Sequence, residues 1–161
     1  MNDAARRAAG RPSTETRGDR AKASFVLHVD EGEVLASGAM IKVSPATDAE
    51  GIGVATQQFV GREGIPIHRH LGDEEVFWVH RGRGIFVLAE QRIPVREGSL
   101  VYISPGTWHG YDNEQEETLL VWAISPPHFV DLFRQLASGV EVPADQREKL
   151  FEAHGFEFRS Q

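Results

Sequence analysis

Residues 68–82 read HRHLGDEEVFWVHRG and form the most informative stretch of the chain. His68 and His70 are separated by one residue, so in an extended strand both side chains lie on the same face, about 6.5 to 7 Å apart. A third histidine, His109, follows a proline-glycine turn in residues 98–113, which read GSLVYISPGTWHGYDN. Three imidazoles arranged in this way can converge on one ion. The pattern therefore predicts a metal site held by β-structure.

Residues 73–75 are all acidic, and strand phase indicates which of them joins the histidines. If the segment that follows is extended, Glu75 and Phe77 project to one face, while Glu74 and Trp78 project to the other. The first acid of the three falls earlier, in the turn. Glu75 is therefore the expected fourth ligand, with Glu74 as the alternative.

The composition limits the possible partners and ligands. The chain has 161 residues, enough for one domain with a core, and a formal net charge of -7. This charge argues against nucleic-acid and anionic-membrane partners, which need clustered Lys and Arg, and favours a small-molecule partner. Because the chain contains no cysteine, any metal must be held by nitrogen and oxygen atoms.

The first two segments of the chain differ sharply in character. Residues 1–23 are basic and lack large apolar side chains after Met1, which predicts a disordered arm. No apolar stretch resembles an export signal or a membrane span, so we expect a cytoplasmic protein. Residues 24–124 contain short β-favouring runs, such as SFVLHV and TLLVWAI, between glycine, proline and acidic turns. This spacing predicts a sandwich or barrel.

Residues 125–161 form the third segment, for which the sequence predicts two short helices packed on the barrel. Ser125 followed by Pro126 resembles a helix start. The first helix would carry an apolar stripe of Phe129, Leu132, Phe133 and Leu136. The second would run from about residue 144 to residue 154 and be ended by Gly155, with Leu150 and Phe151 facing inward.

Strand phase also suggests which residues line a substrate pocket beside the metal. Phe77 shares the phase of Glu75, and Tyr111 shares the phase of His109 if that segment is extended. One of the adjacent Gln57 and Gln58 must face inward, and Gln58 is taken as the candidate. Packing in the core is expected for Trp78 and Trp122. Surface or packing positions are expected for the four other histidines, His28, His80, His128 and His154.

With these residues in place, the sequence resembles the cupin superfamily, and within it the single-domain, quercetinase-like proteins. The first cupin motif pairs H-x-H with a glutamate and a later glycine, matched here by His68, His70, Glu75 and Gly82. The second motif is a glycine, a P-x-G turn, a histidine and an asparagine, matched by Gly98, Gly106, His109 and Asn113. Two turn positions depart from the pattern, where Arg62 replaces a glycine and Ser104 replaces a proline.

The resemblance implies a double-stranded β-helix, a small jelly-roll barrel, with a divalent transition metal held inside by His68, His70, Glu75 and His109. Three imidazoles and one carboxylate suit Fe, Mn, Ni, Co, Cu or Zn better than Ca or Mg. The resemblance also implies a metal-dependent dioxygenase acting on a small enolisable or phenolic compound, with Glu75 as the proton acceptor. The alternatives are a cupin isomerase, lyase or dehydratase that uses the metal as a Lewis acid, and a non-catalytic ligand-binding cupin. Because cupins commonly form dimers, we also expect a homodimer.

Overall fold

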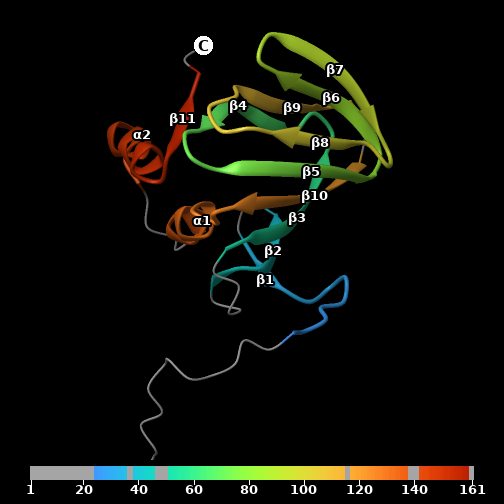
Figure 1. Cartoon of the computed structure of the whole chain (residues 1–161), viewed down its shortest axis with the longest axis horizontal. Helices are drawn as coiled ribbons and strands as arrows, with labels where there is room; N and C mark the ends of the chain where they lie inside the picture. The colour runs from blue at the N-terminus through green and yellow to red at the C-terminus, as the bar shows by residue number, and fades with distance from the viewer. Residues whose placement is uncertain (1–23, 36–37, 46–50, 115–116, 138–141, 160–161) are drawn as a thin grey trace, which may run out of the picture.

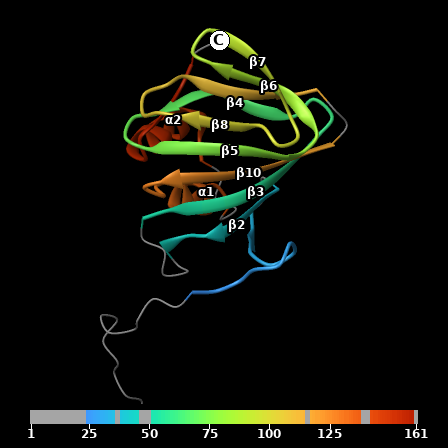
Figure 2. The same ribbon diagram turned by 45° about the vertical axis from the view of Figure 1, so that its right-hand side comes forward.

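The structure is a computed structural model that describes residues 24–35, 38–45, 51–114, 117–137 and 142–159. The disordered arm expected at residues 1–23 lies outside the described residues. Within them, two antiparallel sheets face each other, and the helices lie at one end of the strands, as Figure 1 shows and the turned view of Figure 2 confirms. This arrangement confirms the expected all-β jelly roll with two short C-terminal helices.

The first sheet has six strands and the second has five. In order across the first sheet these are β1 (Glu33–Val34), β2 (Ala39–Val43), β3 (Gly53–Val60), β10 (Glu117–Ser125), β5 (Glu74–Arg81) and β8 (Leu100–Ile103). Across the second sheet the order is β11 (Phe156–Phe158), β4 (Gly64–His70), β9 (His109–Asn113), β6 (Arg83–Leu88) and β7 (Gln91–Arg96).

The core lies between the two sheets and follows the two-residue period of the strands. In β10, Leu120, Trp122 and Ile124 are buried, whereas the residues between them are half-buried. In β5, Glu75 and Phe77 are buried on the same inner face. Each strand therefore presents one apolar face to the interior, as alternation along the chain predicts. The carboxylate of Glu75 is placed in this apolar interior by strand phase alone.

Helix α1 (Phe129–Ala137) packs its apolar stripe against the core. It begins later than the expected start at Ser125, because that residue is the last of β10 and its hydroxyl donates a hydrogen bond of 2.6 Å to the carbonyl of Gly51. The second helix, α2 (Ala144–Ala153), lies close to its expected bounds. Neither helix approaches the length and apolar character that a membrane crossing needs.

Strand β11 was not expected, because the sequence reading assigned the C-terminal segment to helices. Gly155, with φ of +77°, turns the chain back after α2, and its carbonyl accepts a hydrogen bond of 2.9 Å from the N–H of Leu71. The strand then pairs antiparallel with β4, which places Phe156 opposite His70. A three-residue strand carries too little alternation to be recognised in a sequence.

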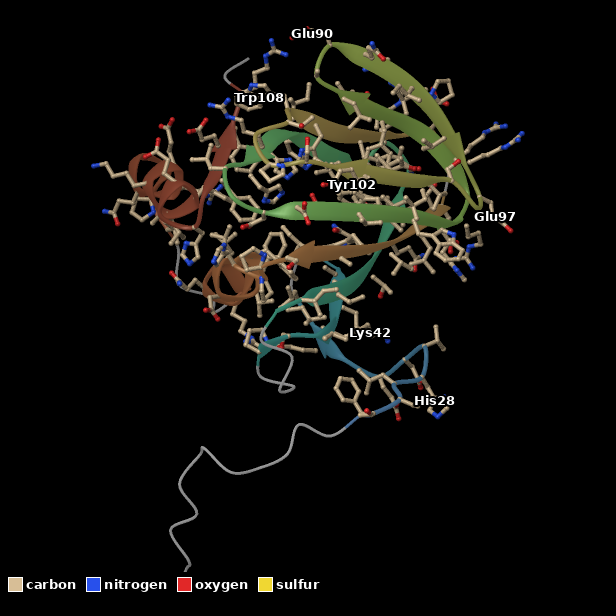
Figure 3. The ribbon with its side chains drawn as sticks, in the orientation of Figure 1. His28, Lys42, Glu90, Glu97, Tyr102 and Trp108 are labelled. Carbon is tan, nitrogen blue, oxygen red and sulfur yellow. The ribbon has the colours of Figure 1, made fainter. Side chains whose placement is uncertain are left out.

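The expected strand over residues 24–29 is not a strand in the structure. These residues run beside the barrel without joining a sheet, and Val26 is 81% exposed. The ammonium group of Lys42 donates hydrogen bonds of 2.9 Å to the carbonyls of His28 and Val29 and holds this segment near β2, where Figure 3 labels Lys42 and His28. The apolar pattern was present, but no neighbouring strand supplies the backbone partners that pairing requires.

Trp78 is a second difference from expectation, because it is exposed rather than packed in the core. It lies on the outer face of β5 opposite Leu100 of β8, and the two side chains are 53% and 63% exposed. Tyr102 shares this outer face (Figure 3). Strand phase sets the orientation of Trp78, and no described helix covers this face. The expected homodimer stays a prediction.

Candidate metal centre

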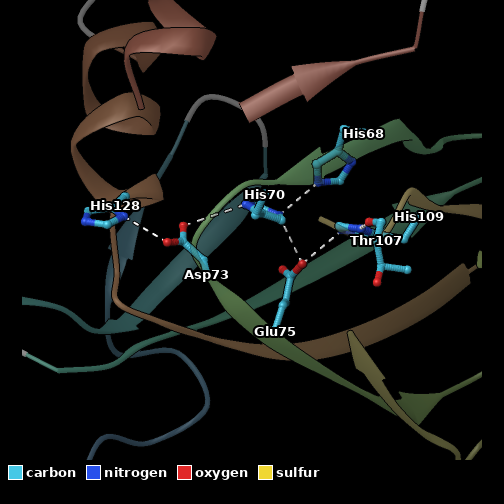
Figure 4. Close-up of polar contacts among 7 residues, drawn as sticks. All are labelled: His68, His70, Asp73, Glu75, Thr107, His109 and His128. Carbon is cyan, nitrogen blue, oxygen red and sulfur yellow. Dashed lines mark hydrogen bonds and ion pairs between the residues drawn. The ribbon is translucent and has the colours of Figure 1, made fainter. Parts of the chain in front are cut away.

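The four residues expected to bind a metal lie together inside the barrel. One ligand atom from each of His68, His70, Glu75 and His109 falls within 4.8 Å of the others, and all four side chains are buried. The Nε2 atom of His70 lies 3.2 Å from Nε2 of His68 and 3.2 Å from Oε2 of Glu75. Nε2 of His109 lies 3.1 Å from the same carboxylate oxygen, as Figure 4 shows.

Strand register and one tight turn bring these residues together. His68 on β4 is the register partner of His109, the first residue of β9. The turn before β9 contains Gly106, whose φ of +78° is a backbone conformation that favours glycine. The N–H of Gly106 donates a hydrogen bond of 2.7 Å to the carbonyl of His70. Glu75 reaches the three imidazoles from β5 in the opposite sheet, so the cluster connects both sheets.

Backbone carbonyls orient two of the three imidazoles. Nδ1 of His68 lies 2.8 Å from the carbonyl oxygen of Pro66, and Nδ1 of His109 lies 2.9 Å from that of Thr107. A carbonyl accepts but does not donate, so Nδ1 must carry the proton in both rings. The Nε2 lone pairs of His68 and His109 are therefore free to bind a cation inside the cluster.

Burial and mutual contact set the ionisation of the cluster. Burial alone would raise the pKa of Glu75, but the adjacent His109 and His70 imidazoles outweigh it and lower the pKa to about 2. Burial, with repulsion from His109 and His70, lowers the pKa of His68 to about 3. At neutral pH the carboxylate is ionised and the His68 imidazole is neutral. These are the forms that bind metal ions.

The cluster fits a divalent transition ion on the evidence of its polar atoms. Oε2 of Glu75 and Nε2 of His109 are both buried, and neither has a hydrogen-bond partner among the described residues although they lie 3.1 Å apart. Buried polar atoms without partners are rare and destabilising. Nitrogen and carboxylate oxygen donors in this number suit a transition ion, which would satisfy both atoms at once.

His68, His70 and Glu75 of the cluster line a cavity of about 580 Å³ whose lining is mainly apolar, while His109 lies behind them, fully buried. Side chains from the first sheet, the second sheet and both helices contribute to the lining. The apolar members are Ile65, Pro66, Phe77, Trp122, Ile124, Phe129, Phe133, Phe151, Phe156 and Phe158. The polar members besides His68, His70 and Glu75 are Gln57, Arg147, Glu148 and Arg159. Phe77 is thus found in the wall where strand phase predicted it.

Two phenylalanines of the unexpected strand β11 are part of this site. The ring of Phe156 lies 4.3 Å from that of His70, centroid to centroid, and the ring of Phe158 lies 5.6 Å from that of His68. They cover the histidine pair on the side of the cavity. Sequence reasoning missed both residues, and the FEF pattern after Gly155 was the only signal that pointed to them.

The prediction that Gln58 faces the pocket is wrong, and its neighbour takes this place. Gln57 lines the cavity, whereas Gln58 is exposed on the outer face of β3. The reason is the phase of β3, in which Ala55 and Phe59 are buried and Gln57 lies on their side of the strand. The sequence required that one of the two glutamines face inward, and the structure identifies which one.

Tyr111 is also corrected, because it is buried in the core and is not part of the cavity wall. Its ring lies 5.5 Å from that of Phe59 and 5.2 Å from that of Phe86, and its hydroxyl donates a 3.2 Å hydrogen bond to the carbonyl of Arg83. The inward phase shared with His109 was right. Two residues along a strand move a side chain by about 6.6 Å, however, which carries Tyr111 away from the metal ligands.

The acidic run at residues 73–75 is divided between three environments. Glu75 is in the cluster, while Glu74 is exposed and accepts a 2.9 Å hydrogen bond from the hydroxyl of Tyr102, so the alternative ligand is excluded by its position. Asp73 is buried, with one oxygen 2.9 Å from Nδ1 of His128. His128 was expected at the surface or in packing and is exposed, but its contact with Asp73 was not anticipated.

Residues 56–125 match the family model described as Cupin domain. This stretch contains all four clustered side chains and strands from both sheets. Residues 56–125 are a cupin domain. Among curated proteins, an uncharacterized protein from Methanocaldococcus jannaschii is 30% identical to this cupin over 63 residues, which cover 39% of this chain and 50% of the relative. The chain therefore spans about half the length of this relative.

Two solved structures are similar to this cupin in fold. An RmlC-like cupin from Shewanella frigidimarina superposes with a TM-score of 0.56 at 14% identity, over 65% of this chain and 92% of that one. A predicted oxalate decarboxylase from Thermotoga maritima gives a TM-score of 0.51 at 18% identity, over 55% of this chain and 78% of that one. At these identities the likeness shows the shared jelly roll alone.

We expect the metal-free protein to lose stability as the pH falls below about 6.5. Unfolded His68 binds a proton below its ordinary pKa of 6.5, whereas the folded residue stays neutral down to about pH 3. The unfolded state then holds more protons, so the free energy of unfolding decreases by up to about 1.4 kcal/mol per pH unit for one proton. Between pH 4.5 and about 2, Glu75 acts in the same direction. Denaturant titrations between pH 7 and pH 5 measure the free energy of unfolding at each pH. We expect this free energy to depend less steeply on pH in His68→Leu than in the wild-type protein, and an equal pH dependence would contradict the assignment.

His70→Ala should remove most of the bound metal, because it deletes one imidazole from the centre of the cluster. His80→Ala is the matched control, since His80 is exposed on β5. Elemental analysis after dialysis against a divalent transition ion measures the metal content of both variants. Wild-type content in His70→Ala, or equal losses in the two variants, would defeat the assignment of the ligands.

Proposed function

We propose that this protein is a metal-dependent cupin enzyme, a dioxygenase acting on a small enolisable or phenolic compound. One observation carries the proposal: three imidazoles and an ionised carboxylate converge beside a mainly apolar cavity, and three of these four groups, His68, His70 and Glu75, line it. Concave, mostly apolar pockets with a few convergent polar groups are typical of small-molecule sites. The resemblance to quercetinase-like cupins in the two sequence motifs supports the choice of reaction.

The donor set supports a catalytic site rather than a purely structural one. Four protein ligands around an octahedral ion leave two positions for small molecules, whereas a structural ion is usually enclosed completely. Fe, Mn, Ni, Co, Cu and Zn are all compatible with these donors. When bound there, a redox-active ion would supply the activation of dioxygen that oxidative cleavage requires.

The cavity walls would bind and orient the substrate. Phe77, Phe129 and Phe133 offer aromatic surfaces suited to a planar ring or enol. With a substrate bound, the same side chains would displace water from around it, which would strengthen electrostatic interactions inside the cavity. A volume of about 580 Å³ is in the usual range for sites that bind small organic molecules.

Glu75 is the proposed proton acceptor for the substrate hydroxyl. With a pKa of about 2 it is ionised at neutral pH, but such a carboxylate is a weak base while His70 and His109 remain beside it. A substrate that separates Glu75 from these imidazoles would remove the groups that lower its pKa, and burial would then raise it. Its basicity would thus increase when a substrate enters the cluster.

Gln57 is the proposed group that fixes the orientation of the substrate. Its carboxamide lies in the cavity wall on β3, and an amide can both donate and accept hydrogen bonds. A polar group in an apolar wall discriminates strongly among ligands, because a ligand without a matching group leaves it unpaired. Gln57 would therefore select compounds with a hydroxyl or carbonyl away from the metal-binding end.

Oxygen uptake by the metal-loaded enzyme tests the proposed reaction. The protein loaded separately with Fe, Mn, Ni, Co, Cu or Zn is offered phenolic, 1,3-dicarbonyl and sugar-derived compounds in an oxygen electrode. We expect oxygen consumption coupled to product with at least one redox-active ion. Full activity with zinc in oxygen-free buffer would instead identify Lewis-acid chemistry, and tight ligand binding without any product would identify a binding protein.

Gln57→Leu should weaken the binding of substrate about tenfold or more, because it removes a hydrogen bond inside the cavity, worth about 1.5 kcal/mol. Gln58→Leu is the matched control, since the same change then falls on the outer face of the same strand. Isothermal titration of a substrate or inhibitor found in the oxygen screen measures both affinities. Equal affinities in the two variants would exclude Gln57 from substrate recognition.

A further inference from the structure

His70 differs from the other two histidines of the cluster in what faces its Nδ1 atom. Nδ1 of His68 and of His109 each meets a backbone carbonyl at hydrogen-bond distance. Nδ1 of His70 is buried and has no hydrogen-bond partner among the described residues. The facing acceptor is Oδ2 of Asp73, at 3.9 Å. His70 is therefore the one clustered imidazole whose outer nitrogen faces a carboxylate.

Asp73 itself is in an unusual position for an acidic residue. Its side chain is only 3% exposed, and a buried carboxylate is destabilising unless it is paired or hydrogen-bonded. Its Oδ1 atom meets Nδ1 of His128 at 2.9 Å, while its Oδ2 atom is turned towards His70 (Figure 4). One carboxylate thus lies between a candidate metal ligand and a histidine outside the cluster. Packing alone gives no reason for a charge at this place.

We propose that Asp73 is a positioning residue for the metal site, with His128 as its anchor. With an ion bound to His70, Nδ1–H of His70 would donate a hydrogen bond to Oδ2 of Asp73, whose Oδ1 is held by His128. The inference rests on the metal site of the proposed function. It adds an arrangement in which the Asp73 carboxylate contacts the His70 imidazole, and this imidazole binds the ion. Such outer carboxylates fix the tautomer and orientation of a ligating histidine and increase its basicity.

In this structure Asp73 and His70 are close but not hydrogen-bonded. At 3.9 Å, Nδ1 of His70 and Oδ2 of Asp73 are about 1 Å too far apart for an N–H···O hydrogen bond. Binding a cation through Nε2 requires the proton to be on Nδ1 and makes that N–H more positive. The attraction to the buried carboxylate then increases, and the two groups are expected to approach each other.

His128 connects this pair to the helix that closes the cavity. It immediately precedes α1, in which Phe129 and Phe133 form part of the cavity wall. The Asp73–His128 contact therefore ties the start of the helix to the turn between β4, which ends at His70, and β5, which carries Glu75. A change at the metal and a change in the wall would be transmitted through one hydrogen bond. We accordingly expect His128 to influence metal affinity although it is outside the cluster.

The first test compares Asp73→Asn with Glu74→Gln, which remove the same charge from adjacent residues. Glu74 is the matched control because its side chain is exposed and accepts a hydrogen bond from the hydroxyl of Tyr102, away from the cluster. Competition against a chromophoric chelator measures the affinity of each protein for Zn and for Ni. We expect Asp73→Asn to bind the ion about 10 to 100-fold more weakly than wild type, the usual loss for outer-shell carboxylates, and Glu74→Gln to match wild type.

The outcomes separate the two proposals. A wild-type protein that binds no transition ion would overturn the metal site itself. Wild-type affinity in Asp73→Asn, when the wild-type protein does bind, would overturn only the role of Asp73. Thermal unfolding of the metal-free variants checks for a merely structural effect. In a purely structural role, Asp73→Asn would lower the metal-free midpoint without changing the spectrum of the cobalt-loaded protein, whereas a positioning role changes that spectrum.

His128→Gln provides an independent test if Asp73→Asn does not fold, because His128 is half exposed and its replacement leaves the buried carboxylate in place. We expect His128→Gln to reduce metal affinity a few-fold. If Asp73→Asn folds, the double variant should lose less affinity than the two single losses combined, because both changes act on the same contact. A crystal structure of the zinc-loaded wild-type protein should show Nδ1 of His70 about 2.8 Å from Oδ2 of Asp73. A distance still near 3.9 Å together with unchanged affinity in His128→Gln would contradict the proposal.

Discussion

The ionised carboxylate of Glu75 inside an apolar barrel is the constraint on which the rest of the structure depends. A charge in such a place is strongly destabilising unless opposite charge or hydrogen-bond donors surround it. The neighbouring imidazoles compensate partly, which is why the pKa of Glu75 is lowered to about 2 in spite of its burial. Three polar atoms of the clustered side chains lack hydrogen-bond partners among the described residues, and two of them, Oε2 of Glu75 and Nε2 of His109, face each other inside the cluster. A bound cation would satisfy these two, so folding produces a site that favours metal binding.

The barrel serves this constraint by holding the ligands from two sides. The histidines come from the second sheet and Glu75 from the first, so neither sheet contains the whole cluster. The C-terminal residues then complete the site, because β11 places Phe156 and Phe158 over the histidine pair and α1 adds further aromatic wall. Residues beyond the cupin motifs therefore decide how large and how apolar the cavity is. We infer that they also decide which molecule it admits.

The ligands could be predicted from sequence because each depended on a local rule. The H-x-H pair needs only the two-residue period of a strand, and the same period separates Glu75 from Glu74. The cavity was harder to predict, since choosing between Gln57 and Gln58 requires the absolute phase of β3, which only packing against Ala55 and Phe59 fixes. Tyr111 faces inward as strand phase predicted, but it lies too far along β9 from His109 to reach the cavity. Phe156 and the Asp73–His128 contact depend on tertiary pairing between distant segments, which neither the short FEF pattern nor a single aspartate identifies in the sequence.

X-ray absorption spectroscopy of the protein loaded with one divalent transition ion tests whether the four clustered side chains bind the same ion. The spectrum reports the donor atoms around the ion and identifies imidazole rings by their characteristic outer-shell scattering. We expect three imidazole nitrogens and a carboxylate oxygen at about 2.0 to 2.2 Å, with any remaining positions filled by light atoms from solvent. A first shell of oxygen atoms without imidazole scattering would contradict this expectation, because the ion would then lie outside the cluster of His68, His70, Glu75 and His109.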